Sequence, residues 1–219
     1  MYSKTRHDCN LHVILNSKVK TRTFKYIKWI LSLIAISIII GISGFVFYLE
    51  TSIDKIMSKD KQNKLMVAIN SSPELPDSFY RTFNKYHPKT FEQGVWGSII
   101  NQLLGKRRNQ CQCREIYIHP GYTDHWIEFT QPIVALEIEK HCSSKKCFEY
   151  NMSVSDFGMN IKGIQEASRK YYNKEIKNLS EKEILELTVI HIAPATYNPL
   201  MHRETLDKEV NKIINKNWL

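Results

Sequence analysis

Charged side chains are absent from the 21 consecutive residues 29–49, which read WILSLIAISIIIGISGFVFYL. At about 1.5 Å per residue, a helix of this length crosses a hydrocarbon core of about 30 Å. A buried core helix is disfavoured, because no face of the segment is polar. A cleaved signal peptide is disfavoured too, since its apolar region is shorter and ends at small residues. The segment therefore predicts one transmembrane helix.

Acidic residues are scarce ahead of this segment. Residues 1–28 hold one, Asp8, against seven basic side chains: Lys4, Arg6, Lys18, Lys20, Arg22, Lys25 and Lys28. Cytoplasmic flanks of membrane helices carry an excess of lysine and arginine. We therefore expect a cytoplasmic tail over 1–28 and a single-pass protein of the cytoplasmic (inner) membrane whose C-terminal part is extracytoplasmic. Of the net charge of +9, about +3 lies outside the tail (9 − 6), too little to indicate a nucleic-acid partner.

Cysteine is also scarce, with five in the chain. Cys9 lies in the tail and is expected to be a free thiol. The other four follow the membrane segment: Cys111, Cys113, Cys142 and Cys147. An even number in an oxidising compartment favours disulfides or free thiols, and their pairing stays open. A zinc site built from these four, or with His141, has suitable ligand types, but C-x-C and C-x4-C are not common structural zinc spacings.

Helical periodicity dominates the rest of the chain, which has no internal repeat. Residues 50–72 predict a helical stalk, and residues 73–219 a folded domain. A capping box at Ser180 and Glu183 precedes an apolar stretch that we expect at the centre of the core. Residues 114–118 suggest a short extended stretch. The predicted fold class is mainly α, with further helices expected at 77–86, 95–104, 133–140, 164–172 and 203–216.

Residues 135–200 carry a run of motifs in unbroken order. ALEIEKHCSSKKCFEYNMSVSDFG (135–158) is similar to the pattern ALxLExxYSKxxILExYLNxIYFG. GIQEASRKYYNKEIKNLSEKEILELTVIHIAPATYNPL (163–200) then follows, with a Gly-x-x-x-Ala helix and a closing Ala-Pro-x-x-Tyr-Asn-Pro. Together they resemble glycosyltransferase family 51, the peptidoglycan glycosyltransferase (transglycosylase) domain of penicillin-binding proteins and monofunctional transglycosylases. The resemblance covers about 65 contiguous residues.

The resemblance implies a lysozyme-like α-helical domain beside the membrane, acting on lipid II. In the family, one glutamate is the general base that deprotonates the 4-hydroxyl of the acceptor sugar. That hydroxyl then displaces undecaprenyl pyrophosphate from the growing glycan chain. A second glutamate, basic side chains and sometimes a divalent metal stabilise the pyrophosphate. This chemistry requires a carboxylate close to the hydroxyl and cations beside the departing diphosphate.

The first family motif, Glu-Asp-x-x-Phe, holds the general base, and LPDSFYRTFNKYHPKTF (75–91) resembles its surroundings. Phe91 then takes the phenylalanine place and Pro88 the aspartate place, while His87 stands where the glutamate is expected. A histidine can accept a proton near neutral pH. A histidine before a proline is, however, more often non-catalytic. Glu92, five residues further on, is the nearest carboxylate and a second candidate base.

The second motif, Gly-Ser-Thr-Ile-Thr-Gln-Gln-(Leu/Val)-x-Lys-Asn, resembles GSIINQLLGKR at 97–107. Both threonines and one glutamine are replaced. The resemblance implies substrate binding by Ser98, Gln102, Lys106 and Arg107, with the two cations beside the pyrophosphate. As a bare charge run, residues 106–108 are more often a solvated or lipid-facing surface, and the resemblance makes the two interpretations about equal.

The third motif, Arg-Lys-x-x-Glu, carries the second glutamate. Counted back without gaps from Ala135, it falls on residues 127–131, where Gln131 replaces the glutamate and the basic pair is gone. An amide forms hydrogen bonds but carries no charge and binds metal weakly. In the fourth motif Glu149 persists, and we expect a structural role for it. The candidate catalytic positions are thus His87, Gln131 and Glu92, and no metal ligand is predicted.

Positions that build the family's core are kept better than positions that carry its reaction. One hypothesis is a peptidoglycan glycosyltransferase with impaired catalysis, using Glu92, Glu128 or His87 as base. Loss of a general base typically costs ~10²–10⁴-fold in rate. The alternative is a catalytically inactive domain of the same fold that binds lipid II, a glycan strand or a cell-wall synthase as a scaffold. A third is a helical domain without a ligand.

Overall fold

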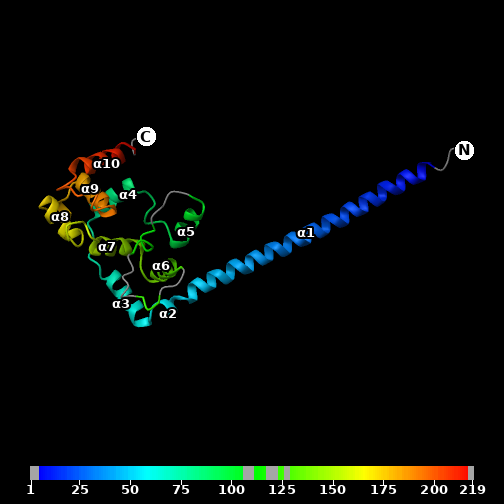
Figure 1. Cartoon of the computed structure of the whole chain (residues 1–219), viewed down its shortest axis with the longest axis horizontal. Coiled ribbons are helices and arrows are strands. Elements are labelled where there is room, and N and C mark those ends of the chain that lie inside the picture. The colour runs from blue at the N-terminus through cyan, green and yellow to red at the C-terminus, as the bar shows by residue number, and fades with distance from the viewer. Residues whose placement is uncertain (1–4, 106–110, 117–122, 126–128, 217–219) are drawn as a thin grey trace. The chain divides into compact units, whose positions relative to one another are not determined.

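A computed structural model describes residues 5–105, 111–116, 123–125 and 129–216, and the chain divides into two units, Met1–Leu49 and Glu50–Leu219. The first unit is built on α1 (Thr5–Thr51), which runs without a break (Figure 1). Its residues Lys25–Thr51 are long and apolar enough to cross a membrane, with a mean hydropathy of 2.6. This stretch contains the predicted transmembrane segment 29–49, and a helix there satisfies its own backbone hydrogen bonds.

Helices also make up the second unit, as predicted, and Figure 1 shows their succession. In the described ranges the extended structure is one isolated antiparallel bridge, Asp156 to Lys162. Residues 114–116 form a turn and a bend instead of the expected extended stretch, and 117–118 lie outside the described residues. The helices are α2 (Ile53–Ile56), α3 (Lys59–Asn70), α4 (Asp77–Tyr86), α5 (Val95–Leu103), α6 (Thr130–His141), α7 (Ser144–Val154), α8 (Ile164–Tyr172), the 3-10 turn η2 (Ile176–Asn178), α9 (Glu181–Ile192) and α10 (Arg203–Lys216).

Residues 50–72, expected as a stalk, pack into the second unit. α2 contacts α6 and α3 contacts α7. Leu65 and Ile69 of α3 are fully buried. The Asp124 carboxylate accepts hydrogen bonds from the backbone N–H of Ser58 at 2.8 Å and from Lys61 Nζ at 2.6 Å. The apolar positions of this stretch therefore pack against α6 and α7, where the sequence suggested a helical stalk leaving the membrane.

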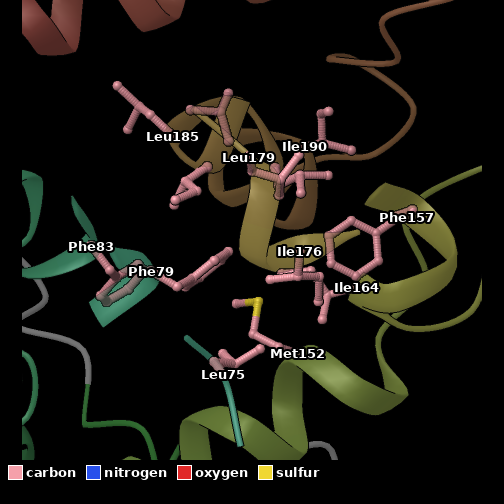
Figure 2. Packing of buried hydrophobic residues seen from close by; sticks show 14 of the residues in the cluster. Leu75, Phe79, Phe83, Met152, Phe157, Ile164, Ile176, Leu179, Leu185 and Ile190 are labelled. Atoms are coloured by element: carbon pink, nitrogen blue, oxygen red, sulfur yellow. The ribbon is translucent and has the colours of Figure 1, made fainter. Parts of the chain in front are cut away.

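The centre of the hydrophobic core is α9, as its apolar sequence predicts. It contacts α4, α8 and α10, and its residues 184–190 are all buried. Figure 2 shows side chains from several segments converging there, among them Phe79 from α4, Met152 from α7 and Ile164 from α8. A helix contacted on several faces needs apolar residues nearly all round, which explains the continuous pattern in this stretch.

Local sequence signals set the helix boundaries around this core. The predicted capping box is present: Ser180 Oγ accepts from the Glu183 backbone N–H, and the Glu183 carboxylate accepts from the Ser180 backbone N–H. At α7 only the first of these two bonds is present, with Ser143 Oγ accepting from the Lys146 backbone N–H. Gly163 precedes α8 at a φ of +76°, and a Cβ there would lie 2.4 Å from the carbonyl oxygen of Ser153. The glycine of the Gly-x-x-x-Ala pattern is thus required by a close backbone approach.

The cysteine pairing that the sequence left open is resolved. Cys113 and Cys147 form a disulfide with a Cα–Cα distance of 5.0 Å, whereas Cys111 and Cys142 are buried free thiols. The bond joins residues 111–116, named here the cysteine loop, to the first turns of α7. The domain therefore contains both a disulfide and free thiols, the two states that the sequence favoured over a zinc site.

Candidate functional site

A pocket of about 280 Å³ opens between α4, α7, α9 and the cysteine loop. Two aromatic rings form one wall, Phe83 of α4 and Phe148 of α7, with centroids 4.4 Å apart. Since two histidines line this space, we name it the histidine pocket. Its lining residues are Phe83, His87, Gln112, Glu115, Phe148, Asn151, Met152, Thr188, His191 and Ile192.

His87 occupies the C-cap of α4, where its backbone N–H donates to the Phe83 carbonyl at 2.8 Å. Its ring lies against the Phe83 ring, with centroids 4.9 Å apart. Burial lowers the pKa of His87, because the charged form loses hydration there. At neutral pH the ring is therefore an uncharged imidazole in an aromatic corner.

His191 approaches the same pocket from the last turn of α9. Ser155 Oγ donates to the Asn151 carbonyl at 2.6 Å, so its one proton is committed. His191 Nε2 lies 2.8 Å from that hydroxyl oxygen and is therefore the donor. This assigns the neutral tautomer with Nδ1 unprotonated. Burial lowers the pKa of His191 to about 4, so it stays neutral over the physiological range.

The cysteine loop supplies the pocket's carboxylate. Glu115 lines the pocket at an exposed position. The loop that carries it is bonded to α7, because the Asn151 side-chain amide donates to the Gln112 carbonyl at 3.1 Å. Sequence reasoning missed Glu115, because a gapless count from Ala135 points to residue 131 instead. The Arg-Glu pair directly after C-x-C was the signal available.

A second group forms around Arg114 and collects three of the predicted residues. Its guanidinium donates to Ser98 Oγ at 3.1 Å and to Gln102 Oε1, both on α5. Its backbone carbonyl accepts from the side-chain amide of Gln131 at 3.2 Å. Ser98 and Gln102 lie one helical turn apart, so a single cation spans both. We call Ser98, Gln102, Arg114 and Gln131 the Arg114 cluster.

Comparison with known proteins decides the family. The family model described as "Transglycosylase" matches residues 97–217. The chain is 40% identical over 164 residues to penicillin-binding protein 1F of Bacillus subtilis (strain 168), a match covering 68% of this chain and 22% of that protein. The chain belongs to the transglycosylase family.

Other relatives carry names from the same family. Identity is 32% over 69 residues to the biosynthetic peptidoglycan transglycosylase of Shewanella frigidimarina (strain NCIMB 400), covering 32% of this chain and 30% of that protein. It is 28% over 120 residues to penicillin-binding protein 1A of Aquifex aeolicus (strain VF5), covering 55% and 15%. The chain thus spans less than a third of the length of each of these relatives.

The transglycosylase match contains some of the candidate residues and not others. The family model begins at Gly97, so it includes the Arg114 cluster and leaves His87 and Glu92 outside. Glu92 is exposed, in the turn between α4 and α5, and does not line the histidine pocket. Gln131 is exposed at the start of α6 and does not line it either. Lys106 and Arg107 lie outside the described residues.

A divalent metal, which the transglycosylase resemblance allows, does not fit the residues present. Gln131 stands at the expected acidic position, and its amide is engaged with the Arg114 carbonyl. Within the part of the chain that the structure describes, no three His, Cys, Asp or Glu side chains come together. We therefore derive no step through a metal. The histidine pocket offers two uncharged imidazoles and the Glu115 carboxylate beside aromatic rings, and the Arg114 cluster offers one cation.

Acid should destabilise this transglycosylase-family chain through His191. Its pKa is about 4 when folded and about 6.5 when unfolded, so the unfolded state binds more protons between these values. The unfolding free energy should therefore fall by about 3 kcal/mol as the pH drops from 6.5 to 4. Urea unfolding of the detergent-solubilised chain at several pH values measures this. His191→Gln should reduce the dependence and leave the smaller part due to His87, while His125→Gln, at an exposed site, should keep it. Equal slopes in both variants would contradict the assignment.

Proposed function

We propose that this chain is a membrane-anchored peptidoglycan glycosyltransferase-like protein that engages lipid II in cell-wall glycan assembly and is impaired in catalysis. The family membership supports the glycan substrate class. The apolar span in α1 and its basic flank support an anchor in the cytoplasmic membrane with residues 1–28 inside. In this topology residues 73–219 work on the outer side.

One observation carries the proposed impairment: neither expected glutamate position holds a carboxylate. A neutral His87 with a lowered pKa is a weak proton acceptor at pH 7. Gln131 cannot ionise, and its amide is already bonded to the Arg114 carbonyl. Glu115 is the carboxylate on the lining of the histidine pocket, and its side chain is exposed. Proton removal from an acceptor hydroxyl is therefore the step that this site supports least.

The alternative function is a scaffold of the same fold that holds lipid II, a glycan strand or a cell-wall synthase without turnover. The intact histidine pocket and the preformed Arg114 cluster favour it, because both are recognition features that need no general base. Arg114 is held by Ser98 and Gln102 with part of its surface open, which suits an anionic group.

Labelled lipid II supplied to the detergent-purified chain tests both functions. We expect saturable binding with polymer formation slow or absent. Polymer at a rate ordinary for a transglycosylase would overturn the impairment. Glu115→Gln and Glu92→Gln form a matched pair, since the first side chain lines the pocket and the second does not. If slow polymerisation is lost in Glu115→Gln alone, Glu115 is the substitute base; no binding and no polymer would refute the lipid II assignment altogether.

A further inference from the structure

Three buried cysteines lie on the cysteine loop and on α7, and two of them, Cys113 and Cys147, form the disulfide that joins these segments. Cys111, Cys113 and Cys147 are 1%, 2% and 0% exposed, so a reductant in solution does not reach the disulfide without an opening motion. A nucleophile already inside the domain has no such barrier. Cys111 is a free thiol in that interior.

The loop backbone brings Cys111 and Cys113 together. The Arg114 backbone N–H donates to the Cys111 carbonyl at 3.0 Å, which closes a turn with Gln112 and Cys113 at its centre. Burial raises the pKa of the Cys111 thiol, and hydrogen bonds from the backbone N–H groups of Arg114 and Cys113 to its sulfur offset part of this rise by favouring the thiolate. Two residues apart in the chain, their Cα atoms are within about 7 Å, close to the usual disulfide span of about 4.4–6.8 Å.

We propose that Cys111 is an internal resolving thiol that moves the disulfide from Cys113–Cys147 to Cys111–Cys113. The Cys111 thiolate attacks the sulfur of Cys113, and a Cys111–Cys113 bond forms. The Cys113–Cys147 bond breaks, and its electron pair leaves on Cys147, which takes up the proton that Cys111 lost. No electron is gained or lost overall, so the step needs no oxidant or reductant. Cys147 suits the leaving role because it lies in the first turns of α7, where a thiolate is stabilised.

The exchange releases one wall of the histidine pocket. The cysteine loop carries Gln112 and Glu115, and α7 carries Phe148, Asn151 and Met152. Without the disulfide, the wall keeps the 3.1 Å hydrogen bond from Asn151 to Gln112. The other end of the loop stays bound to α5 through Arg114. The fold thus contains a covalent latch between two halves of the pocket lining.

Peptide mapping of the full chain in detergent tests this latch. The chain is incubated without added redox reagents, quenched with acid, alkylated and cut with trypsin. Exchange gives a 109–114 peptide, NQCQCR, that is two hydrogens lighter than its reduced form, together with an alkylated 147–162 peptide. Cys111→Ser should abolish this species, and Cys142→Ser should leave it unchanged. Complete retention of the Cys113–Cys147 link in the unmodified chain would overturn the proposal.

Cys147→Ser provides the second measurement. We expect Cys111 and Cys113 of this variant to pair with each other, and diethyl pyrocarbonate to modify His87 about tenfold faster because the wall opens more often. The latch is refuted if both thiols stay free after exposure to glutathione disulfide. An unchanged rate at His87 would refute the effect on the pocket. Should this variant fail to fold, the mapping of the unmodified chain decides alone.

Discussion

Arg203→Ala is expected to lower the unfolding free energy by about 3 kcal/mol, the low end of the range for a buried charge left unpaired. Glu186 is 1% exposed in the core helix α9. Arg203 donates to both of its carboxylate oxygens, at 2.9 and 2.6 Å, and the Tyr172 hydroxyl donates to one of them at 2.8 Å. Without Arg203, the buried Glu186 carboxylate would keep only the Tyr172 hydroxyl and the Lys182 ammonium, which lies 3.8 Å away. Urea unfolding in detergent, followed by tryptophan fluorescence, measures the loss.

Lys182→Ala is the matched control for this prediction. Lys182 Nζ approaches the same Glu186 at 3.8 Å from a half-exposed position, a geometry worth about 0–1 kcal/mol. Replacing both charges, as Arg203→Met with Glu186→Leu, should recover much of the loss, because no unpaired charge is left behind. A cost for Arg203→Ala no greater than that for Lys182→Ala would show that the pair does not stabilise the core.

Restoring the two expected carboxylates, as His87→Glu with Gln131→Glu, should raise lipid II polymerisation by ~10²–10⁴-fold over the parent chain. A carboxyl group at position 87 would enter the partly apolar histidine pocket, where burial raises its pKa toward the range of an effective base. At position 131 the carboxylate would replace the amide that donates to the Arg114 backbone carbonyl, so this bond would be lost and the side chain would be released. The rate of glycan formation from labelled lipid II, at saturating substrate, is the measurement.

Glu92→Gln in this double-variant background should leave the restored rate unchanged, because Glu92 does not line the pocket. Lipid II binding should be retained in every variant, which separates a loss of chemistry from a loss of recognition. A double variant that binds lipid II and still forms no polymer would contradict the account of impairment by two replaced glutamates and would favour the scaffold.

Much of the fold was predictable because its signals are local. The capping box at Ser180 and Glu183 and the apolar run behind it define α9, and the structure places that helix at the centre. The helix at 77–86 begins and ends as its sequence predicts. Residues 50–72 were less predictable, since an amphipathic helix has the same pattern whether it stands alone or packs on α7.

The candidate site was predictable only in part, because its parts come from distant segments. Motif alignment found Ser98, Gln102 and Gln131, yet it contained no hint that Arg114 joins them. Glu115 and His191 are separated by more than 70 residues and meet in the histidine pocket. Their proximity arises from the packing of α9 and the cysteine loop.

By itself, the sequence determined the apolar stretch long enough to cross a membrane, the mainly helical class and the transglycosylase family. Each rests on periodicity, charge or motif order within short windows. The tertiary structure decided that Cys113 pairs with Cys147, that Glu186 is held by Arg203, and that His87 and His191 share a pocket apart from Glu92 and Gln131. These depend on which surfaces bury one another, a property of three-dimensional packing that no linear spacing specifies.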